Sequence, residues 1–293
     1  MEKLEYPKIS VTIVTWNTCS LLKRCLNSIE KLADTSYELF VIDNNSTMDD
    51  TKDFLKNYIH KNPKCIRFDY VLNKKGMGFA YAVNQGLRKS RGEYMMILNS
   101  DTEITSELFS NILKTAEKYT KLGIMGIKIL NNDGSYQKCV FNYPTLFNLI
   151  GNRLLLAKKF PNNKFIQKRL KIITNHDKES IVEFVKGVMM FMPRKTIESA
   201  GYMDEEYFLW FEETDYCQKI KKVGLDIIYA PQHLIYHTGS AGISKMPFWE
   251  KQFIYNRSIR RYFRKHHGYI HSILAGVLDP IALAIGIIIN RKK

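Results

Sequence analysis

The chain has 293 residues, of which 45% are hydrophobic and 25% are charged, an ordinary balance for a globular protein. This composition excludes a wholly disordered or fibrous chain. A formal charge of +15 makes nucleic acid or an anionic membrane a candidate partner. The excess lies in three stretches, residues 152–174, 245–268 and 269–293, and the rest of the chain is neutral. Whatever attracts anions is therefore local.

The first hundred residues alternate short apolar runs with stretches of helical periodicity. Strands are predicted at residues 9–15, 38–42, 66–72 and 94–98. Helices are predicted through 21–29, near 49–58 and through 79–87. This alternation is typical of an α/β fold with a mainly parallel sheet covered by helices on both faces.

The second half of the chain is less regular. The pattern predicts strands at 123–130, 181–185, 188–192 and 226–230, a hairpin turn at 132–134, and a helix opening near 208 and ending near 223. There is no internal repeat or low-complexity linker. We therefore expect one domain over residues 1–244, in which 152–174 is a basic insertion that could face a membrane, followed by a basic and hydrophobic segment over 245–293.

Residues 271–289 are nearly all apolar. A helix over 273–289 would be about 25 Å long, which is marginal for crossing a bilayer. Asp279 and Pro280 would place a carboxylate and a helix break in hydrocarbon, which favours an interfacial or re-entrant segment over a simple span. The sequence predicts a membrane-associated helical tail attracted to an anionic surface, with a C-terminal core helix as the alternative.

Export is not indicated by the first residues, which lack a basic region followed by an apolar run. The five cysteines are scattered and odd in number, so neither a disulfide framework nor a structural zinc site is predicted. With the tail, these features predict a protein at the cytoplasmic side of the cell membrane.

Polar clusters follow four successive predicted strands. They are Thr15-Trp16-Asn17, Asp43-Asn44-Asn45-Ser46, the segment from Asn73 to Gly78, and Asn99-Ser100-Asp101. Any one of them would serve as a turn or a helix cap. Turn chemistry gives no reason for all four to meet at one sheet edge, and ligands bind at that edge in such folds.

The ordered motifs identify a resemblance to a known family. IVTWN, VIDNNS, NKKGMGFAYAVNQG, YMMILNSDT, FEETDYC and HTGSAG together resemble the family 2 glycosyltransferases of the GT-A fold, in particular their rhamnosyltransferase-like branch. The resemblance covers about residues 8–242. It implies a Rossmann-like sheet and an inverting hexosyltransferase without a covalent sugar intermediate.

The resemblance also implies a set of residues that bind the nucleotide-sugar. They are Thr15, Trp16, Asn17, Asp43, Asn73, Gly78, Asn84, Asn99 and Ser100. The chemistry suits this role, because Asp43 can accept the imide N–H of uracil or thymine and Trp16 offers a stacking face. Core packing is the alternative for Trp16.

The metal motif of the family has two acids one residue apart. Here it reads Asn99-Ser100-Asp101, so only Asp101 keeps a carboxylate. The resemblance implies that Asp101 and His237 bind Mg²⁺ or Mn²⁺ together with the diphosphate. The missing acid weakens the expected metal affinity, and a structural hydrogen bond is the alternative for His237.

The acidic motif implies Glu213 as the general base, with Trp210, Glu212 and Asp215 on the acceptor side. Repulsion within the cluster would raise the pKa of one member, which suits a base. Acids at a helix N-terminus also satisfy the helix dipole, which is the alternative explanation for them.

The implied reaction is transfer of a sugar, with L-rhamnose as first choice, from a dTDP- or UDP-sugar to a glycan or polyprenyl-diphosphate-linked acceptor. Nucleic acid is not expected as a partner, because no binding motif is present and strand-edge acids would repel phosphate. A catalytically inactive, membrane-bound nucleotide-sugar-binding scaffold stays open, since Asn99 replaces an acid. Acceptor, linkage and oligomeric state are not indicated by the sequence.

Overall fold

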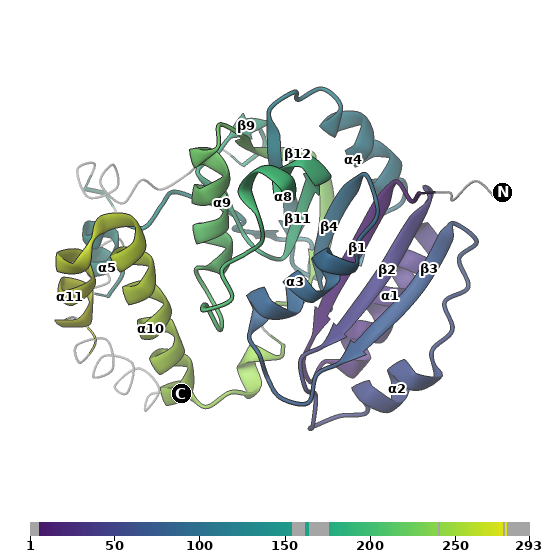
Figure 1. Cartoon of the computed structure of the whole chain (residues 1–293), viewed down its shortest axis with the longest axis horizontal. Helices are drawn as coiled ribbons and strands as arrows, with labels where there is room; N and C mark the ends of the chain where they lie inside the picture. Colours follow the sequence, from purple (N-terminus) through teal and green to yellow (C-terminus); the bar gives the residue numbers. More distant parts are fainter. Residues whose placement is uncertain (1–5, 154–161, 164–175, 240, 278, 280–293) are drawn as a thin grey trace.

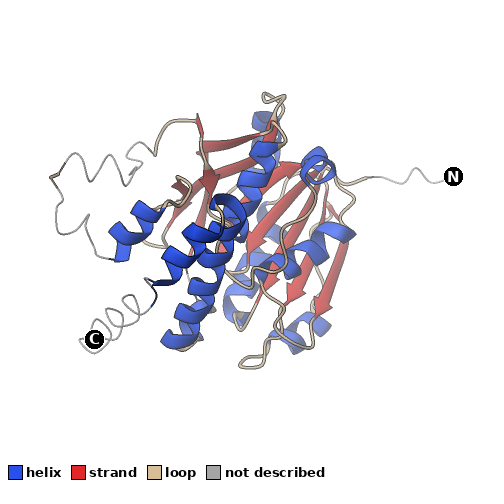
Figure 2. Ribbon diagram, turned by 60° about the vertical axis from the view of Figure 1, so that its left-hand side comes forward, coloured by secondary structure: helices blue, strands red, loops and turns tan. Residues whose placement is uncertain are grey.

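A mixed β-sheet with helices on both sides forms the body of the molecule (Figure 1; Figure 2). The computed structural model describes residues 6–153, 162–163, 176–239, 241–277 and 279. Within these residues the sheet has ten strands, eight of them in the order β3-β2-β1-β4-β11-β6-β12-β5.

The N-terminal half of the sheet is parallel, as the sequence predicts. Its strands are β1 (Ile9–Thr15), β2 (Tyr37–Asp43), β3 (Cys65–Leu72) and β4 (Tyr94–Asn99). The connecting helices are α1 (Cys19–Leu32), α2 (Thr51–Asn57) and α3 (Phe79–Lys89). In Figure 1, α3 lies in front of β1 and α1 behind the sheet, which confirms the α/β prediction.

The other half of the sheet is mixed. It contains β5 (Thr102–Ile104), β6 (Leu122–Leu130), β7 (Tyr136–Gln137), β9 (Ser180–Ile181), β11 (Met189–Pro193) and β12 (Asp226–His237). A separate two-stranded sheet pairs β8 (Val140–Phe141) with β10 (Phe184–Val185). The helices of this half are α4 (Leu108–Ala116), α5 (Leu146–Arg153), α8 (Arg194–Ala200), α9 (Glu212–Lys222), the 3₁₀ turn η1 (Ile243–Lys245), α10 (Phe248–His267) and α11 (Tyr269–Val277).

Two strand predictions in this half are wrong. The expected strand over 181–185 is split, because β9 pairs with β12 while β10 turns away to pair with β8. The strand expected to end at Ala230 continues to His237, with a register shift between Ala230 and Leu234 around Pro231. Proline donates no ladder hydrogen bond, so Pro231 interrupts the apolar run from which the strand was expected. The strand itself continues beyond it after the register shift.

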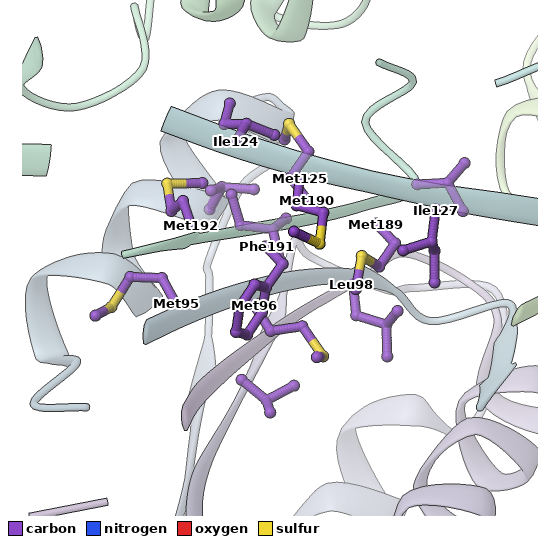
Figure 3. Close-up of a cluster of buried hydrophobic side chains, with 14 of the residues drawn as sticks. Met95, Met96, Leu98, Ile124, Met125, Ile127, Met189, Met190, Phe191 and Met192 are labelled. Carbon is purple, nitrogen blue, oxygen red and sulfur yellow. The ribbon is translucent and has the colours of Figure 1, made fainter. Parts of the chain in front are cut away.

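Methionines fill the centre of the sheet, where β4, β11 and β6 lie side by side (Figure 3). The labelled side chains are Met95, Met96, Leu98, Ile124, Met125, Ile127, Met189, Met190, Phe191 and Met192, and none is more than 2% exposed. Unbranched thioether chains fill irregular space between strands that change direction. This core supports the sheet edge at which β4 ends.

A second apolar cluster joins the C-terminal helices to the rest of the protein. It consists of Leu149, Tyr207, Ile259, Tyr262, Phe263 and Ala275. In Figure 1, α5, α10 and α11 lie together beside α9. The predicted boundary after residue 244 therefore separates segments that pack on each other.

Among the described helices, none is long and apolar enough to cross a membrane. Most of the predicted basic insertion at 152–174 and the second half of the apolar segment 271–289 lie outside the described residues. Both membrane predictions stay expectations.

Candidate active site

A cavity of about 450 Å³ opens at the carboxyl ends of β1 and β4. This is the sheet edge at which the sequence places its polar clusters. Nine predicted site residues line it: Thr15, Trp16, Gly78, Asn99, Ser100, Asp101, Trp210, Glu212 and Glu213. The cavity thus unites residues from both halves of the chain.

Three hydroxyl groups join the ends of the two central strands beneath this cavity. Thr15 Oγ1 lies 3.0 Å from Thr18 Oγ1, which in turn lies 2.8 Å from Ser100 Oγ. These hydrogen bonds fix the position of Ser100, so that the neighbouring Asp101 is held at the cavity wall.

His237, at the end of β12, faces Asp101 with Nε2 3.2 Å from Asp101 Oδ1. Its Nδ1 lies 2.6 Å from Gln137 Oε1. Lys186 Nζ donates to the same amide oxygen at 2.9 Å, and because an ammonium can only donate, this contact fixes the orientation of the amide. His237 Nδ1 therefore donates to Gln137 Oε1, and Nε2 is the ring nitrogen that faces the carboxylate of Asp101.

An imidazole nitrogen and a carboxylate oxygen that face each other are both groups that can serve as ligands of a divalent cation. Burial opposes ionisation of Asp101, but the hydrogen bond and charge of His237 outweigh it and lower the pKa of Asp101. Asn99 Oδ1 is buried nearby without a hydrogen-bond partner among the described residues. In that part of the chain no three His, Cys, Asp or Glu side chains gather as a complete metal site. The residues therefore fit a cation whose remaining ligands come from phosphate or water.

Glu212 and Glu213 begin α9 and also line the cavity. Burial and the neighbouring Glu213 charge raise the pKa of Glu212. Burial also raises the pKa of Glu213, against the opposing effects of backbone N–H groups and of Lys186. Each has an Oε2 atom that is buried without a hydrogen-bond partner in the described structure. Carboxyl groups whose pKa is raised in this way are suited to general acid–base catalysis.

The segment that precedes these acids has an unusual backbone. Trp210 and Phe211 have φ angles of 64° and 69°, a left-handed conformation that bulky residues rarely adopt. Helix α10 holds the segment in place: Ser258 Oγ donates to the Leu209 carbonyl at 2.8 Å, and Tyr255 contacts both aromatic rings. Strain of this kind persists only where surrounding contacts enforce it.

Gly78 brings the start of α3 against the same segment. Its φ is +91°, and a Cβ atom there would lie 2.7 Å from the Phe208 carbonyl oxygen. That oxygen also accepts the Phe79 N–H at 2.8 Å. The glycine is therefore required for the close approach of two cavity walls.

Asp43 and Asn17 do not line the cavity in this structure. Asp43 is fully buried and accepts the Ser46 N–H at 3.0 and 3.1 Å; burial raises its pKa and these bonds oppose the rise. Asn17 Oδ1 accepts the N–H groups of Thr47 and Met48 at 2.8 and 2.9 Å. Both residues shape the turn that supplies cavity residues, and their expected contacts with the nucleotide-sugar stay predictions.

Asn73 and Asn84 also have structural partners. Asn73 exchanges hydrogen bonds with Gln85 at 2.9 and 3.0 Å. Asn84 is fully buried and bonds both backbone groups of Met203, while its Nδ2 also donates to Glu205. Asn84 is not among the residues that line the cavity, and its amide holds the 203–205 segment; its expected contact with the donor stays a prediction.

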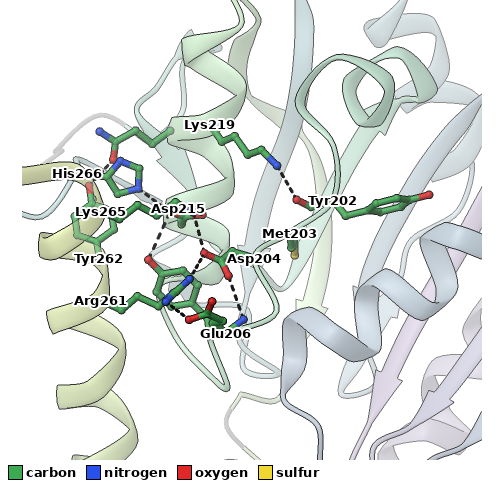
Figure 4. Close-up of polar contacts among 12 residues, drawn as sticks. Tyr202, Met203, Asp204, Glu206, Asp215, Lys219, Arg261, Tyr262, Lys265 and His266 are labelled. Carbon is green, nitrogen blue, oxygen red and sulfur yellow. Dashed lines mark hydrogen bonds and ion pairs between the residues drawn. The ribbon is translucent and has the colours of Figure 1, made fainter.

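The side chain of Asp215 lies among residues of α10 (Figure 4). Its buried carboxylate accepts hydrogen bonds from Lys265 Nζ at 2.8 Å and His266 Nε2 at 2.6 Å, both on α10. Lys265 also contacts Asp204, which binds Arg261 at 2.8 Å. Asp215 thus connects α9 to α10, and its expected place on the acceptor side stays a prediction.

Lys186 and Gln137 are cavity or near-cavity residues that the sequence did not single out. Lys186 stands between two short strands and carries no motif, and Gln137 reaches His237 across 100 positions. Burial lowers the pKa of Lys186, while the charges of Asp101 and Glu213 oppose this. Nothing in the local pattern distinguishes either residue from an ordinary surface side chain.

Among solved structures, the chain is similar to a mannosyltransferase of Pyrobaculum calidifontis determined with GDP-mannose and Mn²⁺. The TM-score is 0.58 at 17% identity, over 97% of this chain and 74% of that one. This likeness shows the fold, and it confirms the expected GT-A architecture.

Two curated relatives are glycosyltransferases by name. The chain is 25% identical to the hexosyltransferase Agl10 of low-salt glycan biosynthesis in Haloferax volcanii, over 75% of this chain but 63% of that protein, which is less than two thirds of its length. It is 22% identical to the N-acetylglucosaminyl-diphospho-decaprenol L-rhamnosyltransferase of Mycobacterium tuberculosis, over 78% and 75% of the two chains. Residues 10–178, more than half of the chain, match glycosyl transferase family 2, and the protein belongs to that family.

Proposed function

We propose that the protein is an inverting, metal-dependent glycosyltransferase that moves a hexose from a dTDP- or UDP-sugar to a glycan or lipid-linked acceptor. The observation that carries this proposal is the shared cavity, which is lined by Asp101, the partner of His237, and by Glu212 and Glu213. A cation site and a buried base at one cavity are the groups that direct transfer from a nucleotide-sugar requires.

Asp101 and His237 would hold Mg²⁺ or Mn²⁺, and such a cation, when bound, stabilises negative charge on a leaving diphosphate. Glu213 accepts the proton of the acceptor hydroxyl as its oxygen bonds to the anomeric carbon. The bond from that carbon to the diphosphate breaks, the nucleoside diphosphate leaves with the electron pair, and the configuration inverts. The raised pKa of the buried pair brings the base closer to neutral pH.

L-rhamnose from dTDP-L-rhamnose is our first choice of donor, supported by the name of the mycobacterial relative. That name also specifies a diphospho-decaprenol-linked sugar as acceptor. We extend a polyprenyl-diphosphate-linked acceptor to this chain as part of the proposal.

The test is a titration of the purified protein with UDP, dTDP, GDP and CMP, with Mn²⁺ and with chelator, followed by a transfer assay. We expect a metal-dependent affinity for dTDP or UDP. Glu213→Gln should keep nucleotide binding and lose transfer, whereas Asp101→Ala should weaken metal-dependent binding as well.

Transfer by Glu213→Gln at a rate near that of the unaltered protein would overturn the assignment of the base. If the protein binds nucleotide but transfers sugar from none of the donors tested, the result would support the alternative, a nucleotide-sugar-binding scaffold. The observation that motivates this alternative is that Asn99 stands where the family motif has an acid.

Helix α10 supports an orientation of the cavity toward the cytoplasmic face of a membrane. Glu250 lines the cavity, and on the same helix Trp249 and Phe253 are 67% and 63% exposed. Arg257 and Arg264 are exposed further along. Aromatic side chains beside cationic ones suit the interface of an anionic bilayer.

Sedimentation with phosphatidylcholine vesicles, with and without phosphatidylglycerol, tests this orientation. We expect binding to the anionic vesicles, reduced in the double variant Trp249→Ser/Phe253→Ser and unchanged in Ile59→Ser, an equally exposed apolar residue outside α10 and α11. Equal binding by the double variant and the control variant would contradict it.

A further inference from the structure

Lys186 provides the positive charge of the cavity. Of the described residues that line it, four are acids, Asp101, Glu212, Glu213 and Glu250, and Lys186 is the one basic side chain. A diphosphate brought into this space meets these four carboxyl groups. Without positive charge, these groups would repel it.

The Asn99-Ser100-Asp101 motif makes this requirement stronger. Asn99 brings no charge, so a cation held there has one protein carboxylate and one neutral imidazole as ligands. Fewer charged ligands mean weaker retention of the cation. A fixed ammonium group would supply positive charge that does not depend on the concentration of metal.

The position of Lys186 is set by a chain of contacts. Its Nζ donates to Gln137 Oε1 at 2.9 Å, the same oxygen accepts from His237 Nδ1 at 2.6 Å, and His237 Nε2 faces Asp101 at 3.2 Å. The ammonium therefore lies one amide oxygen away from the imidazole of the candidate cation site.

The backbone directly after Lys186 lies against the candidate base. A Cβ atom on Gly187 would be 3.4 Å from Glu213 Cβ. Lys186 thus stands between the Asp101–His237 pair and Glu213, where a leaving diphosphate must sit if both act on the same donor. An ammonium group has three hydrogens, and the hydrogen bonds found in the described structure use one of them.

We propose that Lys186 binds the diphosphate of the nucleotide-sugar and stabilises the charge that develops on it as the sugar leaves, beside the cation at Asp101 and His237. This inference rests on the proposed function. It adds a ligand for the donor from the loop between β10 and β11. Gln137 is a positioning residue, because it orients both Lys186 and His237.

The test compares the affinities of uridine, UMP and UDP, or the thymidine series if the protein prefers it, by calorimetry in chelator and in Mn²⁺. Lys186→Met keeps an unbranched side chain that is one atom shorter and removes the charge, and Lys186→Arg keeps the charge. Lys128→Met is the matched control, because Lys128 lies on β6, forms an ion pair with Asp177 and does not line the cavity.

In chelator we expect Lys186→Met to weaken UDP binding on the order of ten- to a hundredfold, the size of a charge-assisted contact, with uridine affinity unchanged. In Mn²⁺ the loss should be smaller. Lys186→Arg should bind UDP within a few-fold of the unaltered protein, and Lys128→Met should not differ from it.

Equal UDP affinity of Lys186→Met and the unaltered protein in chelator would overturn the inference and leave the proposed function standing. Parallel loss of uridine and UDP affinity would also overturn it, since a purely structural lysine would act on both. Failure of the unaltered protein to bind any nucleotide would instead refute the proposed function.

Discussion

Replacing Gly78 by alanine tests whether the two walls of the cavity depend on the contact between α3 and the Phe208 segment. Gly78 has φ 91° and ψ 163°, a region that is accessible almost only to glycine. Gly268, after α10, has nearly the same conformation, with φ 89° and ψ 173°. A Cβ atom at Gly268 would meet nothing within 4 Å, whereas at Gly78 it would meet the Phe208 carbonyl oxygen at 2.7 Å and Cα at 2.8 Å.

Comparing the variants Gly78→Ala and Gly268→Ala separates two effects on the free energy of unfolding. Forcing alanine into this backbone region costs about 1–3 kcal/mol at either site. Overlap with the Phe208 backbone adds about 1–3 kcal/mol at Gly78 alone, because backbone atoms must move. With about 2 °C of Tm per kcal/mol for a chain of this size, Gly78→Ala should melt roughly 2–6 °C below Gly268→Ala.

Thermal unfolding monitored by circular dichroism measures the difference, and nucleotide titration measures its effect on the cavity. We expect weaker nucleotide binding in Gly78→Ala and unchanged binding in Gly268→Ala. Equal melting temperatures for the two variants would refute the reasoning, since both carry the same backbone cost.

Three further substitutions test how other buried polar groups are used. Glu212→Gln should raise the unfolding free energy, measured by urea titration, more at pH 8 than at pH 5. The reason is that a carboxyl group whose pKa is raised in the folded state contributes stability below its unfolded pKa of about 4.3, and this contribution is lost as the pH rises through the folded pKa. Glutamine carries no charge at either pH. Asn84→Ala should lower the unfolding free energy by about 2–4 kcal/mol, because the Asn84 amide forms hydrogen bonds with Met203 and Glu205. The affinity for nucleotide, measured below the melting temperature, should stay the same. A large loss of affinity would show that Asn84 contacts the donor. Asp215→Asn should lower the unfolding free energy by about 3 kcal/mol, which is the low end for a broken buried ion pair, because Lys265 keeps its contact with Asp204. An unchanged midpoint of urea unfolding would show that the contact of Asp215 with α10 contributes nothing to stability.

The strands and the polar clusters that follow them could be predicted because both are local patterns. Thr15, Asn99 and Asp101 stand directly after apolar runs, and parallel strands place such residues at one edge. The fold class needed no more than this alternation.

The partners of buried polar side chains could not be predicted, because they come from distant parts of the chain. Asn84 bonds residues 119 and 121 positions away, and Asp215 bonds residues 50 and 51 positions away. A motif shows that a polar residue is present, but the direction of its side chain depends on contacts that sequence spacing does not contain. Lys186 is the converse case, a residue with no motif that the fold carries into the cavity.

The contacts by which α10 holds the 208–211 segment affect the order in which the parts of the protein can fold during synthesis. The parallel strands β1 to β4 lie within the first hundred residues and can pair as soon as they emerge. The wall that carries Glu213 depends on Tyr255, Ser258 and Lys265, which are made some forty to fifty residues after it. A nascent chain would therefore complete its parallel half-sheet well before the cavity wall that carries Glu213.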